Sequence, residues 1–262
     1  MPVLEPKYKS TALFCGNCSQ IRQIRTEPDR MKIMDASPPQ GVRARARAQL
    51  LDDVSRIARS HLAAEGAAGL SVRAIAREMG LASSALYRYY PSRDALLTQL
   101  IIEAYDDLGQ AAEKAEAKVD RSDLAGRARA LARSVRGWAI ANPHEFALIY
   151  GSPVPGYQAP EDTIDPATRV SALFVSLTAD MKRKPKLRNS QISPSLEKQL
   201  KAVDEFFGVS TNHEALALGI GMWAQIFGMV SFEIFGTFNN AFDDAEAIFE
   251  FQVDAAIQAL NL

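Results

Sequence analysis

Cysteine and histidine are the scarcest reactive residues in this chain, with two cysteines and three histidines among 262 residues. Cys15 and Cys18 have the Cys-x-x-Cys spacing of half a zinc site, but a structural zinc ion takes four ligands. His61, His144 and His213 lie far from this pair and from one another in the sequence. We therefore expect no metal site, and we interpret the thiols as reduced and incidental.

The groupings that carry catalysis are also missing from the sequence. It has no Ser/His/Asp or Cys/His set, no glycine-rich phosphate loop and no His/Glu cluster at helical spacing. His144 and His213 are better explained as surface or helix-start residues. We expect no catalytic residues and no cofactor, so that an enzyme is the weaker alternative to a binding protein.

Continuous apolar segments are few. Residues 1–30 lack the apolar core of a signal peptide. Residues 216–235 are the one apolar stretch of membrane-spanning length, but they contain Gln225 and Glu233 and have no flanking Lys or Arg. A buried helix fits this stretch better than a span, because a span would place a carboxylate in lipid. We therefore expect a cytoplasmic protein without a membrane partner.

The net charge of −1 is unevenly distributed. Residues 43–93 hold nine arginines and four acidic residues, a balance of +5, whereas residues 94–262 hold 15 basic and 23 acidic residues, a balance of −8. A compact basic segment on an acidic body indicates a polyanionic partner for the basic segment alone. A solvated basic face is the alternative explanation.

Apolar residues recur at spacings of three and four along most of the chain, which predicts an all-helical protein without strands. The length suits one large domain or two smaller ones. Expected helices cover 43–65, 72–79, 83–90, 93–118, 124–141, 144–150, 166–182, 195–207, 212–238 and 243–260. Residues 152–162 and 184–194 are expected to be loops, and residues 1–41 a disordered tail.

The short helices on either side of Gly80 have the form of a helix-turn-helix. Ser71 is expected to cap the first helix, and Gly80 supplies a turn that strains other residues. The second helix presents small and polar residues outward, as a helix lying in the DNA major groove must. These outward residues are Ser83, Ser84, Tyr87 and Arg88, and the residues expected to hold the two helices together are Ile75, Leu81, Ala85 and Leu86.

Residues 71–97 closely resemble the tetracycline-repressor (TetR) family of bacterial regulators. The resemblance is carried by Ala76, Gly80, Leu86-Tyr87-Arg88-Tyr89-Tyr90 and Ser92-Arg93-Asp94-Ala95-Leu96-Leu97. It implies a helix-turn-helix DNA-binding domain over residues 42–97 and a helical domain for ligand binding and dimerisation over residues 98–262. Ala82 departs from the family, which usually has a Ser or Thr cap there, and we expect Ser83 or Ser84 to cap instead.

The C-terminal half is similar to a subset of the same family with a Trp–His–Gly signature. The matching segment is Trp223-Ala-Gln-Ile-Phe-Gly228, followed by Glu233 and Gly236, although Phe227 stands where that subset has histidine. The Asn142-Pro143 and Tyr150-Gly151 steps are also similar to this type.

The resemblance also implies which residues contact DNA. Base or groove contacts come from Ser83, Ser84 and Arg88, and phosphate contacts come from Tyr87, Arg93 and the helix start Ser71, Val72 and Arg73. Arg43, Arg45 and Arg47 form a basic lead-in, a positively charged segment that precedes the helix-turn-helix. They either contact phosphates or the minor groove, or they are solvated surface charges. Tyr89 and Tyr90 are better explained as core residues.

A repressor that a small molecule releases from a palindromic operator is the leading interpretation, although an activator, or a helical sensor that no longer binds DNA, remains open. A bundle cavity would suit an apolar or aromatic effector, but its aromatic residues could equally fill the core. These residues are Tyr105, Trp138, Tyr150, Trp223 and Phe227. Residues 212–238 are apolar on more than one face, so we expect them to form a homodimer interface with residues 243–260.

Overall fold

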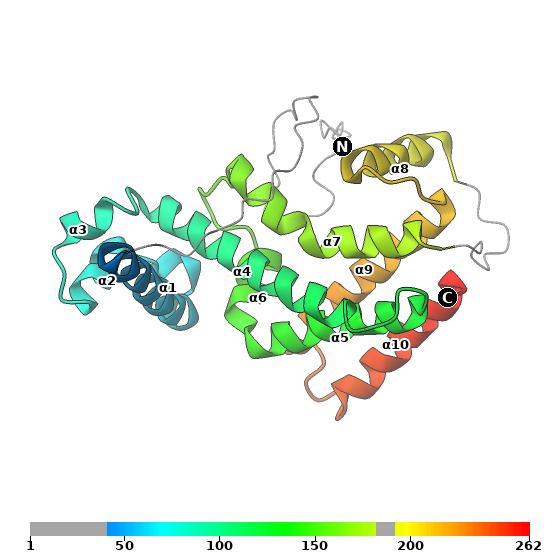
Figure 1. Ribbon diagram of the computed structural model, residues 1–262. Helices are drawn as coiled ribbons and strands as arrows, with labels where there is room; N and C mark the ends of the chain where they lie inside the picture. The colour runs from blue at the N-terminus through cyan, green and yellow to red at the C-terminus, as the bar shows by residue number, and fades with distance from the viewer. Residues whose placement is uncertain (1–40, 182–191) are drawn as a thin grey trace, which may run out of the picture.

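The computed structural model describes residues 41–181 and 192–262, and this part of the chain is all helical, as the sequence predicts (Figure 1). The predicted tail, apart from residue 41, and most of the predicted loop at 184–194 lie outside the described residues. The helices are α1 Val42–Gly69, α2 Val72–Glu78, α3 Ser83–Tyr87, α4 Arg93–Glu116, α5 Leu124–Ala141, α6 Pro143–Tyr150, the 3-10 turn η1 Glu161–Thr163, α7 Ile164–Ala179, α8 Pro194–Phe207, α9 His213–Ile234 and α10 Ala245–Leu260.

The helices α1, α2 and α3 form a small unit at one end of the molecule (Figure 1). Its core contains Val54 and Ala58 of α1, Ile75 of α2 and Leu86 of α3, none of which is exposed to solvent. Full burial of apolar side chains from all three helices stabilises their arrangement. The unit is therefore built around the residues that the helical period placed inward.

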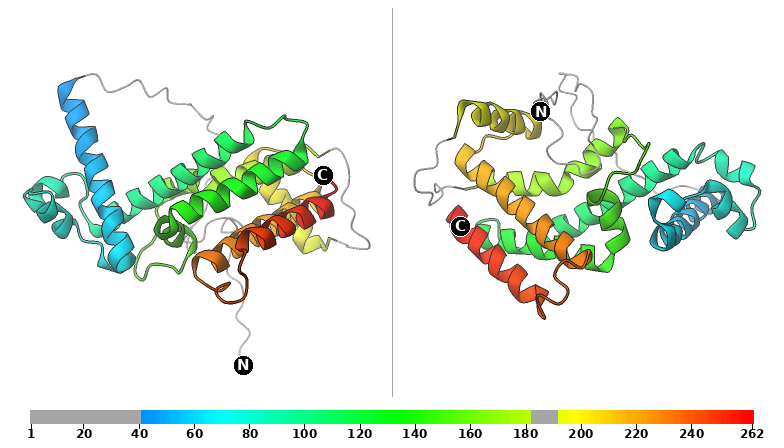
Figure 2. Two further views of the ribbon diagram at one scale, coloured as in Figure 1. Left: turned by 90° about the horizontal axis from the view of Figure 1, so that it is seen from below. Right: turned by 180° about the vertical axis from the view of Figure 1, so that it is seen from behind.

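The remaining helices form a bundle, and α4 connects it to the small unit. α4 packs against α5 and α7, and α9 packs against α5, α7 and α10. α8 lies at the periphery, where it contacts α9, and α5 and α10 lie side by side (Figures 1 and 2). α1 also contacts α6, so the two parts of the molecule touch away from α4 as well.

Arginines of α5 hold α10 against the bundle. They are spaced three or four residues apart and therefore lie on one face of α5. The ion pairs are Arg129–Asp254 at 2.8 Å, Arg133–Glu250 at 2.7 Å and Arg136–Glu246 at 3.2 Å. The Arg136 guanidinium also lies 5.5 Å from the centroid of the Phe249 ring. The position of α10 is thus set by charge as well as by its apolar face.

Several predicted helix ends differ from the structure. Gly66 was expected to end the first helix; it takes a left-handed φ of 68°, but α1 resumes beyond it to Gly69. The helix predicted over 212–238 ends at Ile234, because Gly236 has a φ of 76° and turns the chain. The predicted helix over 83–90 is shorter, since α3 ends at Tyr87.

The apolar stretch seen in the sequence is α9. It is the one described helix that is long and apolar enough to cross a membrane by length and composition, with a mean hydropathy of 1.6. In the structure α9 contacts α5, α7, α8 and α10, as a central helix of a bundle does. One apolar face of α9 is therefore covered within the protein, whereas Phe232 near its end is exposed.

Candidate DNA-binding site and effector domain

Ser71 and Gly80 define the two ends of α2 and so the turn that leads to α3. The Ser71 Oγ accepts a hydrogen bond from the Ala74 N–H at 3.3 Å, so Ser71 caps α2 as predicted. Gly80 has a φ of 67°, which residues with a Cβ rarely adopt. The Leu81 N–H then donates to the Ala76 carbonyl at 2.8 Å. The conformation of Gly80 and this hydrogen bond fix the direction in which α3 leaves the turn.

The predicted cap of α3 is wrong. Neither Ser83 nor Ser84 caps the helix, because both lie within its first turn, and Ala82 occupies the N-cap position without a side-chain hydrogen bond. Ala82 already has the extended backbone of a cap residue, with φ −65° and ψ 134°. Ser83 is therefore the first residue of α3, and the Ser84 side chain is exposed.

The predicted reading face of α3 lies on the surface. Ser84, Tyr87 and Arg88 are exposed, Ser83 is half-buried, and Leu86 points into the core with no exposed surface. A five-residue helix fixed from behind by a buried leucine can present these side chains to a groove. The face is thus available for contact with DNA.

At the start of α2, Arg73 is exposed and Val72 is buried. The Val72 side chain packs in the core, so only its backbone can reach a phosphate. Arg77 is also exposed, one turn after Arg73 on α2, and is not among the residues predicted to contact DNA. The spacing of four residues between the two arginines was the signal that could have found it.

Arg93 has an intramolecular role at the start of α4. Its Nη2 donates to the Ala67 carbonyl at 2.6 Å, near the end of α1, and its Nη1 lies 3.4 Å from Asp94. The side chain is half-buried. Arg93 therefore ties the end of α1 to the start of α4, and its contact with a phosphate stays a prediction.

The basic lead-in occupies the first turns of α1. Arg45 and Arg47 are exposed, and the Arg47 guanidinium lies 5.5 Å from the centroid of the Tyr89 ring. The Arg43 side chain lies outside the described residues. Tyr89 is half-buried and Tyr90 is buried, which confirms both as core residues; burial also raises the pKa of the Tyr90 hydroxyl.

Comparisons with known proteins agree with this geometry. Residues 56–100 match the family model of bacterial regulatory proteins of the tetR family, and residues 128–256 match the tetracyclin repressor-like C-terminal domain. The chain is 37% identical over 224 residues to the HTH-type transcriptional regulators Rv1816 of Mycobacterium tuberculosis and Mb1846 of Mycobacterium bovis, covering 84% of this chain and 96% of each relative. The chain belongs to the TetR family.

Solved structures show the same fold. The crystal structure of the candidate regulatory protein SCO4313 superposes with a TM-score of 0.70 at 30% identity, covering 84% of this chain and 99% of the other. A protein of unknown function from Rhodococcus sp. RHA1 superposes with a TM-score of 0.60 at 21% identity, over 81% of this chain and 96% of the other, and shares the fold. Since its family and relatives are transcriptional regulators, this TetR-family protein is a regulator with a helix-turn-helix and not an enzyme.

Four of the five aromatic residues predicted to line an effector cavity lie together in the C-terminal domain. Tyr105 packs edge-on against Tyr150 with ring centroids 5.9 Å apart, Tyr150 lies 4.4 Å from Phe227, and Phe227 lies 5.0 Å from Trp223. Phe146, which is not among the predicted cavity residues, joins the cluster with its ring centroid 5.3 Å from that of Tyr150. We call these five residues the aromatic cluster.

Trp138 stands apart from the aromatic cluster. It is half-buried, and its carbonyl accepts hydrogen bonds from the backbone and side-chain amides of Asn142, both at 2.9 Å. Among the described residues its ring makes no ring contact with the cluster. The rings of the cluster are in mutual contact, so they fill the centre of this domain.

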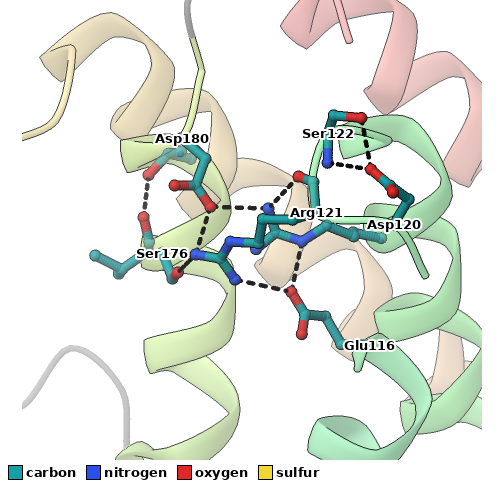
Figure 3. Close-up of polar contacts among 9 residues, drawn as sticks. Glu116, Asp120, Arg121, Ser122, Ser176 and Asp180 are labelled. Atoms are coloured by element: carbon teal, nitrogen blue, oxygen red, sulfur yellow. Dashed lines mark hydrogen bonds and ion pairs between the residues drawn. The ribbon is translucent and has the colours of Figure 1, made fainter. Parts of the chain in front are cut away.

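A surface cavity of about 590 Å³ lies at the end of the bundle that is remote from α3. Asp180 on its wall lies 2.6 Å from Arg121 (Figure 3). It also lies 2.8 Å from the buried Arg127, which in turn binds Glu116. The lining residues are Asp120, Arg121, Ser122, Asp123, Leu124, Ala125, Asp180, Met181, Asn261 and Leu262. The charged wall is occupied by these internal pairs, which join the ends of α4 and α7 to the start of α5.

Proposed function

We propose that this TetR-family regulator is a repressor that binds a palindromic operator as a homodimer and leaves it when a small molecule binds the C-terminal domain. The observation that supports the DNA-binding part is the exposed row formed by Ser84 and Tyr87 of α3 and by Arg88, which directly follows the helix; the buried Leu86 holds this row from behind. A protein that acts on chromosomal DNA in this way works in the cytoplasm.

Each exposed group has a role that follows from its chemistry. Arg88 reads a base edge, because a guanidinium pairs with guanine through two hydrogen bonds. Tyr87, the α2 start with Arg73, and Arg93 contact phosphates, which position the protein without reading sequence. Ser83 and Ser84 lie at the α3 start beside the groove, and Arg45 and Arg47 extend the contact along the backbone or minor groove.

Dimerisation uses α9, α10 and the turn between them. Four phenylalanines in this region are strongly exposed in the single chain, and large apolar side chains in such numbers on one region favour a protein interface. They are Phe232 (49% exposed), Phe235 (53%), Phe242 (47%) and Phe251 (68%). Phe249, Val253 and Ile257 of α10 are buried within the chain, so the interface is assigned to the outward residues alone.

The effector is an apolar or aromatic compound that enters the aromatic cluster. Because the rings of Tyr150, Phe227 and Trp223 lie in contact, a ligand must part them to bind. Tyr150 and Phe146 belong to α6, which also contacts α1 and α4. Parting the rings therefore moves a helix that touches the DNA-binding domain.

Selection of bound sequences from a random DNA pool by the purified full-length protein tests the proposal. We expect an inverted repeat with half-sites about 34–36 Å apart. Binding to it should weaken with salt, with a log–log slope of about −0.9 per neutralised phosphate. A screen of apolar and aromatic compounds for release of that DNA follows. If no sequence is enriched, the proposal of a specific operator is wrong. If no compound releases the protein from its DNA, the proposal of an apolar or aromatic effector is wrong.

A further inference from the structure

Arg59 of α1 lies where the DNA-binding domain meets the C-terminal domain. Its Nη2 is 3.2 Å from Glu103 and 3.3 Å from Asp107, both on α4, and its Nε is 3.6 Å from the Glu145 carboxylate on α6. Within residues 41–181 and 192–262, these are the ion pairs that join α1 to α4 or α6. One guanidinium thus connects α1 to two helices of the other domain.

The contact with α6 is the loosest of the three. The Nε–H is buried and has no hydrogen-bond partner, while the nearest Glu145 oxygen is 3.6 Å away. A buried donor without an acceptor is unfavourable, and an approach of about 0.5 Å would complete the hydrogen bond. The Nη2 contacts to α4 already have hydrogen-bond geometry. Of the contacts that Arg59 makes, the one between α1 and α6 can therefore still shorten, whereas those between α1 and α4 already have their final length.

The other carboxylates depend less on Arg59 than Glu145 does. Glu103 also accepts hydrogen bonds from the Ser55 Oγ at 2.9 Å and the Gln99 Nε2 at 3.0 Å. Glu145 is mostly buried and, among the described residues, has Arg59 as its only side-chain partner. Loss of the Arg59–Glu145 pair would thus leave the ion pairs between α1 and α4 in place and remove the one between α1 and α6, whose relative position would then depend on their packing alone.

We propose that Arg59 is a positioning residue that, through Glu145, fixes the tilt of the DNA-binding domain on the C-terminal domain and so determines which half-site spacing the dimer accepts. This inference rests on the proposed dimer and palindrome. In a dimer the distance between the two copies of α3 depends on that tilt. One base pair moves a half-site by about 3.4 Å and rotates it by about 35°, so a small change in tilt favours another spacing.

The experiment uses the full-length protein and synthetic operators whose half-sites are moved apart or together in steps of one base pair. Dissociation constants are measured at one salt concentration for the wild type and for Glu145→Gln, which keeps the shape of the side chain and removes its charge. Glu113→Gln is the matched control, because Glu113 pairs with Arg169 at 2.7 Å between α4 and α7, away from α1. Thermal unfolding and binding to a single half-site are measured for each protein.

In Glu145→Gln we expect the ratio of affinities between the best and the next-best spacing to fall about three- to tenfold. The affinity for a single half-site should be unchanged, because α3 is untouched. Arg59→Lys keeps the charge beside Glu103 and Asp107 but lacks Nε, so it should give the same broadening. The double variant Arg59→Lys/Glu145→Gln should show no further change in the spacing profile, since both substitutions remove the same contact.

An unchanged spacing profile in Glu145→Gln, or equal broadening in Glu113→Gln, would overturn the inference. A loss of affinity that is the same at every spacing would also overturn it, because that is the result of a merely structural role. If the wild type itself binds paired half-sites no better than one, the proposed dimeric operator fails first, and with it the basis of this inference.

Discussion

Arg136 of α5 and Glu233 of α9 form a two-point ion pair, with Nε to Oε2 at 2.9 Å and Nη2 to Oε1 at 2.8 Å. This pair explains how a carboxylate is accommodated in the most apolar helix of the protein. Both side chains are mostly buried, at 16% and 20% exposure. Because two parallel hydrogen bonds between charged groups are stronger than neutral ones, the pair fixes α9 against α5.

Replacement of Arg136 by Met should therefore destabilise the fold. Glu233 would be left mostly buried without a cation, which we expect to lower the free energy of unfolding by about 1–3 kcal/mol in urea denaturation. Lys201→Met is the control, since the Lys201–Glu205 pair is exposed and 3.8 Å long and should contribute less than about 0.5 kcal/mol. Equal effects of the two variants would contradict this assignment.

Replacement of Gly80 by Ala tests the turn that precedes α3. An added Cβ would meet no atom within 4 Å, so the cost is that of the left-handed backbone alone, about 1–2 kcal/mol. Operator affinity should fall with stability. Gly137→Ala in α5 is the contrasting variant, because Gly137 is helical and equally unobstructed and should gain about 0.5–1 kcal/mol. Calorimetry of both variants shows whether the change in stability has opposite signs, a loss in Gly80→Ala and a gain in Gly137→Ala.

The residues of α3 should separate into two classes in DNA binding. Tyr87→Phe removes a hydroxyl proposed to contact phosphate, so the affinity should fall alike for all sequences. Arg88→Ala should relax selectivity at one base position by about 1–3 kcal/mol. Competition binding with a panel of single-base operator variants distinguishes them. Unchanged affinity and selectivity in both variants would exclude α3 as the reading helix.

The exposed phenylalanine of α10 provides the test of the dimer. Phe251→Asp places a charge at a side chain that is 68% exposed in the single chain. If this residue lies in the interface, the variant should sediment as a monomer at micromolar concentration and lose operator binding, while its helical content is kept. Gln199→Asp, at an exposed position of the peripheral α8, serves as the control for added surface charge outside the proposed interface. A dimer that persists in Phe251→Asp would place the interface elsewhere.

Acid should weaken the attachment of α10 to α5. The hydrogen bond from Arg133 is the main cause that holds the pKa of Glu250 below its ordinary value of 4.5. A carboxyl group with a lowered pKa in the folded state contributes stability above the pKa of the unfolded state, and that stability is lost as the pH falls through the folded value. The difference in unfolding free energy between the wild type and Arg133→Gln should therefore shrink from pH 7 to below pH 4. If the difference in unfolding free energy stays constant from pH 7 to below pH 4, the Arg133–Glu250 pair is not its source.

Much of the fold follows from local patterns. The sequence predicts the bounds of α5 as residues 124–141, the turn at Gly80 and the burial of Leu86, because each depends on helical period or backbone conformation. The sequence shows Arg59 only as one of the nine basic residues of its segment. It does not predict its ion pairs, because Glu103 and Asp107 lie 44 and 48 positions away in the chain. Pairs between distant helices depend on how the helices cross, which a period along one helix does not specify.

The aromatic cluster shows the same limit. Helical period identifies Tyr105, Tyr150, Trp223 and Phe227 as inward residues, but it does not say which inward faces meet. Phe146 was omitted although it is fully buried within the cluster, and Trp138 was included although its ring lies outside it. The side of α6 that meets α9 is set by the packing of the whole bundle.

The continuity of α4 has a consequence for how the molecule divides. The helix runs for 24 residues from Arg93 to Glu116, about 36 Å, and belongs both to the DNA-binding unit and to the bundle. The predicted domain boundary at residue 97 therefore falls inside a helix and not in a connecting loop. A protease would find no exposed linker there, and a cut at this point would remove the first turn of α4 with Ser92, its cap. We expect the two units to lose their structure together on heating, as one cooperative body.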